Sequence, residues 1–386
     1  MKPFNYHQPT EIRFGRGRLK EIPSSVTRLG GRCLLVTVPD APEFGGLFGK
    51  VKGMLAEARI PLAHFAGVVP NPTTDIVTAG ARMARDFKAD VILGLGGGSS
   101  MDTAKAIAVE ATHPGTAWDY LFFREKQPTD KTLPVVVVTT TSGTGSHVTQ
   151  VAVVTNPTEK NKSALYHSLL YPRTSIVDSD LMLTVPARVT AATGFDVFAH
   201  AFESYINPGG SPYTDMMALE ALAIVSKFLP VAVRNGRNPE ARELMAWADT
   251  LAGLCIANSG VTLPHGIGMA IGGLYPHVSH GEALAVVYPA ILRYSYRAAP
   301  AKFAAVGRIM DRRLAAETGL KAAEKSCAAI ERFIRRIGLS LKLHELRVPE
   351  EELAALALQS LVLPDYRNHP RVATLEDVSR ILGESH

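Results

Sequence analysis

The first half of the chain alternates short strand-forming runs with stretches of helical length, and this alternation restricts the folds open to it. Strands alternating with helices predict a parallel sheet with helices on both faces. The run 135–138 is apolar without interruption, as expected of a strand buried on both sides. The strand-like runs are 33–38, 62–69, 91–96, 134–140, 151–155 and 174–178, with amphipathic segments such as 47–58 and 74–87 between the earlier ones.

From about Pro186 the pattern changes, and apolar periods of helical length follow one another with almost no alternation of period two. These segments are 187–205, 213–233, 239–258, 281–296, 320–337 and 350–360. A length of 386 residues also suggests about two domains. We therefore predict an α/β domain with a mostly parallel sheet at 1–185 and an all-helical domain at 186–386.

Composition and charge argue against several classes of partner. The net charge is +5, but Lys and Arg are interleaved with acids, and the densest basic stretch, 331–336, has the pattern of a solvated helix face. No run reaches about 18 uninterrupted apolar residues, and the first residues lack the apolar core of a signal peptide. The three cysteines are far apart in the sequence, and we interpret them as buried thiols. We expect a cytoplasmic protein that binds neither nucleic acid nor membrane.

A glycine-rich turn, GLGGGSSMDTAK, occupies residues 94–105. A strand runs directly into Gly96, Gly97 and Gly98, and a helix begins at Ser99. Glycines let the backbone turn sharply and approach an anion, and the helix start adds unpaired N–H groups and a positive dipole. The turn predicts a diphosphate cradle, although it matches neither of the two common phosphate-binding motifs. A tight turn without a ligand is the alternative.

A second polar turn, TTTSGTGSHVT, follows the next buried strand at 139–149. It is rich in hydroxyl side chains and contains two glycines. Ligands of open α/β sheets bind beyond the carboxyl ends of the strands, so both turns are expected to line one binding site. An ordinary surface loop is the alternative here.

Acidic and imidazole side chains cluster in the second half. Asp196 and His200 are four residues apart in a helical pattern, which places both on one face of the helix. His265, His277 and His280 follow among glycines. Imidazole and carboxylate ligands suit a divalent cation, so Asp196, His200 and two of the later histidines predict a four-ligand metal site. For each histidine alone, a structural hydrogen bond is the alternative.

Several of these motifs, in this order, resemble the iron-containing (group III) alcohol dehydrogenases. The resemblance begins at EIRFGRG (11–17) and includes Asn71–Pro72, both polar turns and IVDSDLMLTVP (176–186). It continues through TGFDVFAHAFESY, which contains Asp196, and the histidine segment, and it ends at HPRVATLED (369–377). The resemblance implies a Rossmann-like dinucleotide-binding domain followed by a helical metal-binding domain, and a homodimer.

The resemblance also implies the site residues. Asp196, His200, His265 and His280 match the metal ligands, and we prefer His280 to His277 because Gly281 follows it as in the family. The metal is expected to be Fe²⁺, with Zn²⁺ as the alternative. Expected cofactor-binding residues are Gly97, Gly98 and Ser99 at the diphosphate, Asp102 in the same motif, Thr139, Thr140, Ser142 and Thr144 along the nucleotide, Asn71 nearby, and Lys162 towards the ribose.

The chain departs from the family pattern at two informative positions. Met269 stands where many members have a second histidine after the third ligand, and we take His277 as the catalytic candidate that replaces it in proton transfer. Val38 stands where members preferring NAD commonly carry an aspartate that repels a 2′-phosphate. NADP is therefore slightly favoured over NAD, although Asp40 is close by.

The function expected from the resemblance is hydride transfer between NAD(P) and a small primary alcohol or diol, or its aldehyde. A glycerol dehydrogenase or a dehydroquinate synthase could use the same fold, and a metal-free reductase of the maleylacetate type is a further alternative. The helical segments around His200 and His265 are mostly apolar and lack Lys and Arg, which favours a small neutral substrate. A non-catalytic nucleotide-binding protein is the remaining alternative.

Overall fold

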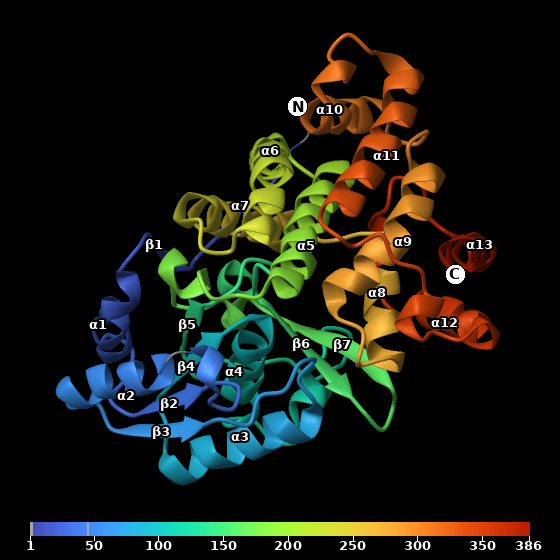
Figure 1. Ribbon diagram of the computed structural model, residues 1–386. Helices are drawn as coiled ribbons and strands as arrows, with labels where there is room; N and C mark the ends of the chain where they lie inside the picture. The colour runs from blue at the N-terminus through green and yellow to red at the C-terminus, as the bar shows by residue number, and fades with distance from the viewer. Residues whose placement is uncertain (1–2, 45) are drawn as a thin grey trace. The chain divides into compact units, whose positions relative to one another are not determined.

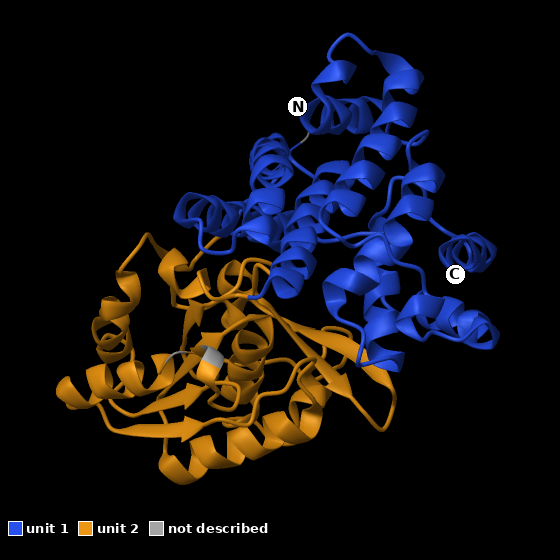
Figure 2. Ribbon diagram, in the orientation of Figure 1, with its two compact units in different colours: residues 1–7, 186–386 blue, residues 8–185 orange. Residues whose placement is uncertain are grey.

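The computed structural model describes residues 3–44 and 46–386. The chain forms two compact units: Gln8–Val185, and Pro186–His386 together with the N-terminal residues up to His7 (Figure 2). The sequence analysis placed residues 1–7 in the α/β domain, but the described residues 3–7 group with the helical unit. The Tyr6 ring packs edge-on against Tyr213 with 4.6 Å between ring centroids, and the His7 backbone N–H donates to Asn258 Oδ1 at 2.8 Å.

The unit Gln8–Val185 is built on a parallel sheet, which confirms the predicted fold class. Within residues 3–44 and 46–386 the sheet has six strands in the order β1-β8-β5-β4-β2-β3. Its strands β2, β3, β4 and β5 are labelled in Figure 1. Every neighbouring pair in it runs parallel. The strands are β1 (Glu11–Phe14), β2 (Cys33–Val36), β3 (Leu62–Phe65), β4 (Val91–Gly96), β5 (Val135–Thr139) and β8 (Thr174–Val177).

Apolar side chains cover both faces of this sheet, because successive residues of a strand point to opposite sides. On β4, Ile92 belongs to one hydrophobic cluster and Leu93 to the other. The first cluster includes residues of helices α3 (Thr74–Phe87) and α4 (Gly98–Glu110), and the second includes residues of α1 (Ile22–Thr27) and α2 (Leu47–Glu57). The uninterrupted apolar runs of the central strands follow from burial on both faces.

Two further strands form a separate antiparallel pair, β6 (Val151–Asn156) and β7 (Asn161–Tyr166). The strand predicted at 151–155 therefore exists, but it lies outside the parallel sheet. The sequence analysis did not identify β7, whose polar residues Asn161, Lys162 and Ser163 weaken its strand signal.

The regular secondary structure of the second unit is helical throughout its described residues. Helices α5 (Ala187–Ile206), α6 (Pro212–Arg234), α7 (Pro239–Ser259), α9 (His280–Ser295) and α11 (Gly319–Arg336) follow the predicted segments closely. Helices α8 (Leu263–Leu274), α10 (Pro300–Met310) and α13 (Leu375–Ser385) were not predicted as elements. The segment predicted at 350–360 is a 3-10 turn followed by α12 (Leu353–Gln359).

Helix α6 is apolar and long enough to cross a membrane by length and composition alone, and α7 with α8 passes the same test only as one span bent by 101°. Half of the apolar stretch of α6 is buried inside the protein. The core helices of soluble proteins share these properties, and α6 contacts α5 and α7. These helices are weak grounds for a membrane span.

Candidate metal and cofactor sites

Four predicted residues meet around one carboxylate oxygen in the helical unit. The Oδ1 atom of Asp196 on α5 lies 3.6 Å from His200 Nε2, one turn along the same helix. It also lies 3.5 Å from His265 Nε2 on α8 and 3.8 Å from His280 Nε2 at the start of α9. The His200 and His265 rings stack at 4.7 Å. Three helices therefore bring together the residues that the sequence proposed as ligands.

The spacing of these atoms fits a shared cation better than direct hydrogen bonds. Ligands about 2.1 Å from a tetrahedral ion lie roughly 3.4 Å from one another, which is close to the separations found here. Asp196 Oδ1 and His265 Nε2 are buried, and neither has a hydrogen-bond partner among the described residues. Asp196, His265 and His280 each offer a ligand atom within 4.8 Å of the others. The donor set of carboxylate and imidazole suits iron or zinc.

The cluster attracts positive charge. Burial raises the pKa of Asp196, but His200, His280 and His265 lower it overall, so the carboxylate stays ionised. Burial lowers the pKa of His265, but Glu203 and Asp196 outweigh this effect and raise it to about 10. The site thus favours a cation beside Asp196, and a metal ion would replace the proton on the imidazole nitrogen that faces this oxygen.

Glu203 is a site residue that the sequence analysis missed. It is fully buried on α5, and its Oε1 accepts a hydrogen bond of 2.7 Å from His265 Nδ1. This bond leaves His265 Nε2 directed at Asp196, as in metal sites where a carboxylate orients a histidine ligand. The available signal was spacing, since Glu203 lies seven residues after Asp196 and three after His200 on the same helical face.

His277 lies apart from this cluster. It is exposed, and its Nε2 hydrogen-bonds to the Leu346 carbonyl at 3.0 Å. Its ring packs edge-on to Tyr275 at 6.3 Å. Its position lends no support to the predicted role in proton transfer. The preference for His280 over His277 as a ligand agrees with the geometry.

The glycine-rich turn has the predicted form of a strand end followed by a helix start. Gly96 ends β4 with a φ of +148°, a conformation that favours glycine. A Cβ on Gly98 would lie 2.4 Å from Thr144 Cγ2, and one on Gly97 would lie 3.1 Å from Thr141 Oγ1. The two polar turns therefore pack against each other, as the sequence analysis expected for two parts of one binding site.

Hydroxyl groups in the second turn are partly used within the unit. Thr139 Oγ1 donates to the Thr141 carbonyl at 2.8 Å, and Ser142 Oγ lies 3.2 Å from Met182 Sδ. Thr144 Oγ1 accepts from the Ser146 N–H at 3.2 Å, and the Thr140 N–H donates to the Gly96 carbonyl at 3.0 Å. Their predicted cofactor contacts stay predictions.

Two more predicted cofactor residues, Asn71 and Lys162, lie together although 91 positions separate them in sequence. Lys162 Nζ donates to Asn71 Oδ1 at 2.9 Å. Asn71 has a φ of +52°, which an asparagine tolerates better than most residues. The pair brings a cation and an amide to one place in the unit, and their contacts with the cofactor stay predictions.

Asp102 and Lys105 point into the protein beneath the second turn. Asp102 accepts from Ser146 Oγ at 2.6 Å and from the Val153 N–H at 3.2 Å. The fully buried Lys105 ammonium donates to the carbonyls of Ser146, Thr149 and Val151 at 2.7 to 2.8 Å, and to Ser146 Oγ at 2.9 Å. Both residues therefore hold the polar turn in place, and Asp102 uses both of its carboxylate oxygens internally.

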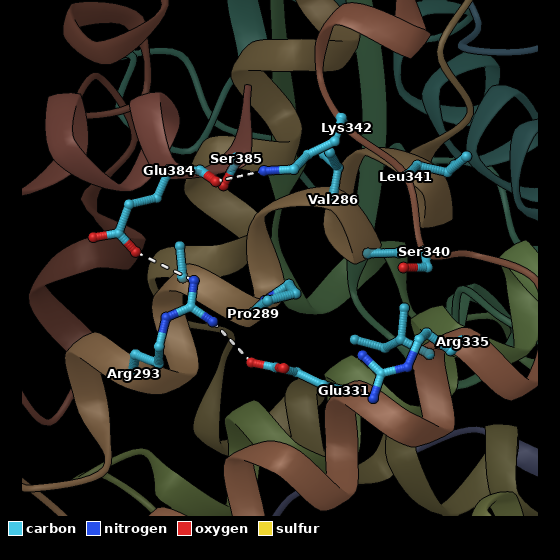
Figure 3. A pocket seen from close by; sticks show the side chains of 13 residues that line it. Val286, Pro289, Arg293, Glu331, Arg335, Ser340, Leu341, Lys342, Glu384 and Ser385 are labelled. Carbon is cyan, nitrogen blue, oxygen red and sulfur yellow. Dashed lines mark hydrogen bonds and ion pairs between the residues drawn. The ribbon is translucent and has the colours of Figure 1, made fainter.

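A cavity of about 220 Å³ lies elsewhere in the helical unit, between α9, α11, α13 and residues 340–342 (Figure 3). Three of its charged side chains pair with one another, since Arg293 bonds to Glu331 at 2.8 Å and to Glu384 at 3.2 Å. Lys342 Nζ donates to the Glu384 carbonyl at 2.8 Å. None of the predicted site residues lines this cavity.

Comparison with known proteins places both units in one family. Residues 9–179 match the family described as iron-containing alcohol dehydrogenase, and residues 190–386 match the C-terminal part of the Fe-containing alcohol dehydrogenase family. The chain is 33% identical over 378 residues to NAD-dependent methanol dehydrogenase of Bacillus methanolicus, covering 98% of both chains. It is 35% identical over 384 residues to 1,3-propanediol dehydrogenase of Klebsiella pneumoniae, covering 99% of this chain and 98% of the relative.

The fold also matches that of a solved structure along its whole length. The chain superposes on an archaeal halo-thermophilic alcohol dehydrogenase from a Red Sea brine pool with a TM-score of 0.96, at 34% identity and full coverage of both chains. The fold, the cluster and these matches define a metal-dependent oxidoreductase acting on CH–OH groups. The chain belongs to the iron-containing alcohol dehydrogenase family, which confirms the resemblance found in its sequence.

Proposed function

We propose that this protein interconverts small primary alcohols or diols and their aldehydes, with a nicotinamide dinucleotide as cofactor and one divalent metal, iron in preference to zinc, held by Asp196, His200, His265 and His280. The observation that carries the proposal is the convergence of three imidazole nitrogens at 3.5 to 3.8 Å from one buried carboxylate oxygen. Family membership favours iron, and the ligand set also suits zinc.

The bound groups supply the chemistry that side chains lack: a Lewis acid for the substrate oxygen from the metal, and hydride exchange from the nicotinamide. The chain itself fixes charge and orientation. Asp196 and Glu203 provide two buried negative charges beside the imidazoles, and Glu203 accepts a hydrogen bond from the Nδ1–H of His265 so that Nε2 faces the cluster. Burial of Asp196 and His265 excludes water and strengthens these interactions.

For the cofactor, the glycine turn offers the N–H groups at the start of α4 to a diphosphate. The contacts of Gly97, Gly98, Ser99, Thr139, Thr140, Ser142, Thr144, Asn71 and Lys162 with the nucleotide are proposed on the resemblance and on their shared location in one unit. Asp102 is proposed to act by holding the Ser146 turn.

We favour NAD(H) over NADP(H). A relative 33% identical along nearly the whole chain is named NAD-dependent, and the slight preference for NADP expected from Val38 finds no support among the relatives compared. The half-buried Val38 stands just after β2, where an aspartate would repel the 2′-phosphate of NADP(H). The nearest carboxylate, on Asp40, lies two residues further on and is exposed. Some NADP(H) activity is therefore expected beside the main activity with NAD(H).

The proposed substrate is small and neutral because α8, which carries His265, contains no Lys or Arg and is mostly apolar. A phosphorylated substrate of the dehydroquinate synthase kind would require cationic groups there. The four clustered donors argue against a metal-free reductase. We also propose a cytoplasmic homodimer, in line with three buried free cysteines and with the family resemblance.

The deciding experiment is metal analysis combined with an activity panel. Protein stripped with a chelator is reconstituted anaerobically with Fe²⁺ or Zn²⁺ and assayed with methanol, 1,3-propanediol and butanol, and with the matching aldehydes, using NADH and NADPH separately. We expect one metal ion per chain and activity that returns with the metal. Full activity in the metal-free protein would refute the proposal.

A further inference from the structure

Four donor groups on three residues, Thr262, His265 and Tyr288, converge on the side chain of Glu203. His265 Nδ1 of α8 lies 2.7 Å from Glu203 Oε1, and the Tyr288 hydroxyl of α9 lies 3.4 Å from the same oxygen. On the other side, Glu203 Oε2 accepts from the backbone N–H of Thr262 at 2.8 Å and from its hydroxyl at 3.2 Å. Both carboxylate oxygens are thus occupied by donors.

The arrangement is buried throughout. Glu203, Thr262 and Tyr288 are each 0% exposed. A carboxylate removed from water is tolerated only where donors replace its hydration, and four donor groups on three residues do so here. An apolar side chain at this position would leave the buried Thr262 N–H and the His265 Nδ1–H without an acceptor. The acid is therefore explained by the donors that it accepts from, and His265 is the one among them that belongs to the metal cluster.

The network continues outward through His369 near the C-terminus. His369 Nδ1 lies 3.1 Å from the Thr262 hydroxyl, and its Nε2 lies 2.6 Å from Ser295 Oγ on α9. Burial lowers the pKa of His369 to about 3, so the ring is neutral and carries one proton. Thr262 thus bridges Glu203 and His369, and Ser295 of α9 holds His369 at the other end of this hydrogen-bond network.

We propose that Glu203 is the positioning residue of the metal site: it fixes the tautomer and ring orientation of His265, and Thr262 and His369 hold Glu203 in turn. This inference rests on the proposed function, because it presumes that His265 is a ligand. Glu203 does not contact the substrate or the metal. It acts through His265 by keeping the proton on Nδ1 and leaving Nε2 free for coordination.

The first variant is Glu203→Gln. An amide has one acceptor oxygen, so it cannot accept from His265 on one side and from Thr262 on the other, and its NH₂ group must face a donor. Metal affinity is measured anaerobically by titrating metal-free protein with Fe²⁺, and with Co²⁺ to follow the ligand field by visible absorption. We expect Glu203→Gln to weaken metal binding by about 10- to 100-fold and to alter the Co²⁺ spectrum.

The second variant is Thr262→Val, which removes one hydroxyl from the network and keeps the backbone N–H bond to Glu203. We expect a smaller loss of metal affinity, about threefold to tenfold, below that for direct partners of a ligand. Its matched control is Thr250→Val on α7, a buried threonine whose hydroxyl donates to the Ala246 carbonyl at 2.9 Å. Thermal unfolding of each variant reports whether it folds.

The outcomes separate this inference from the proposed function. If the unmodified protein binds neither metal, the proposed function fails. If it binds metal and a folded Glu203→Gln protein binds within twofold of the same affinity with an unchanged Co²⁺ spectrum, the positioning role is refuted. If Glu203→Gln does not fold, Thr262→Val decides, and metal affinity equal to that of Thr250→Val overturns the inference.

Discussion

A Cβ atom on Gly281 would lie 2.0 Å from the backbone carbonyl oxygen of Ala192. Gly281 follows His280 in the first turn of α9, and Ala192 lies one turn before Asp196 on α5. The missing side chain lets the two helices touch through their backbones next to the residues that each contributes to the metal cluster. The spacing of Asp196 and His280 thus depends on this contact.

Replacing Gly281 with alanine should push α9 away from α5. Because the clash is with backbone, which cannot rotate away, we expect a loss of about 1–3 kcal/mol in the free energy of unfolding and reduced metal content. Chemical denaturation and metal analysis measure the two effects. The matched control is Gly383→Ala on α13, where a Cβ meets nothing within 4 Å and helix propensity favours alanine. Equal metal content in both variants would contradict the argument.

His280→Ala should abolish metal retention and turnover, because it removes one of the imidazoles around Asp196. His277→Ala is its control, since this exposed histidine lies apart from the cluster and its Nε2 hydrogen-bonds to the Leu346 carbonyl. We expect His277→Ala to keep its metal. The same variant tests the predicted catalytic role: a fall in kcat with normal metal content would support proton transfer by His277, and unchanged kcat would remove it.

Lys105→Met should destabilise the α/β unit. The substitution leaves buried carbonyls of the second turn and the Asp102 carboxylate without their cation, and removing one member of a buried charged set costs about 3–5 kcal/mol. We also expect weaker cofactor binding, measured by fluorescence titration with NADH, because the turn loses its anchor. Lys131→Met, at an exposed position, should change stability by about 0.5 kcal/mol or less. Similar stability of the two variants would be inconsistent with an anchoring role.

Val38→Asp should sharpen the preference for NAD(H). A carboxylate just after β2 would repel the 2′-phosphate of NADPH, and about tenfold lower kcat/KM with NADPH corresponds to about 1.4 kcal/mol. The value with NADH should change far less. The control Val38→Asn introduces a side chain with the shape of aspartate but no charge, so it should discriminate little between NADH and NADPH. If the asparagine variant discriminates as strongly, charge is not the cause.

The three cysteines should resist thiol reagents in the folded protein and react on unfolding. Burial raises the pKa of Cys33, Cys255 and Cys327 to about 12, from an ordinary value of 9.0. Between pH 9 and 12 the folded thiols hold protons that the unfolded thiols lose. Their stabilising contribution is therefore complete below pH 9 and declines as pH rises towards 12, by at most about 1.4 kcal/mol per thiol per pH unit.

Both parts of that prediction are measurable. A thiol reagent at pH 8 should label almost none of the three cysteines until denaturant is added. Denaturant titrations at pH 9 and pH 10 should show lower stability at the higher pH, and Cys255→Ala should reduce that difference. Rapid labelling of the native protein would show that these thiols are accessible.

The sequence by itself determined the class of fold and the donor set. Uninterrupted apolar strands could only be buried on both faces, so the parallel sheet followed from the run 135–138 and its neighbours. The spacing of Asp196 and His200 placed both on one helical face, because an α-helix repeats every 3.6 residues. Local periodicity did not reveal β7 or the separate β6–β7 pair, since strand pairing depends on partners far away in sequence.

Only the tertiary structure decided which residues act together. Asp196 and His265 are on different helices, and no periodicity fixes how two helices meet; the packing of α5, α8 and α9, with Gly281 against Ala192, does so. The same packing places Glu203 within hydrogen-bond distance of His265, and it places His277 beside the Leu346 carbonyl, away from the metal cluster. Sequence spacing constrains neighbours within one element, whereas contacts between elements depend on which side chains fill the shared core.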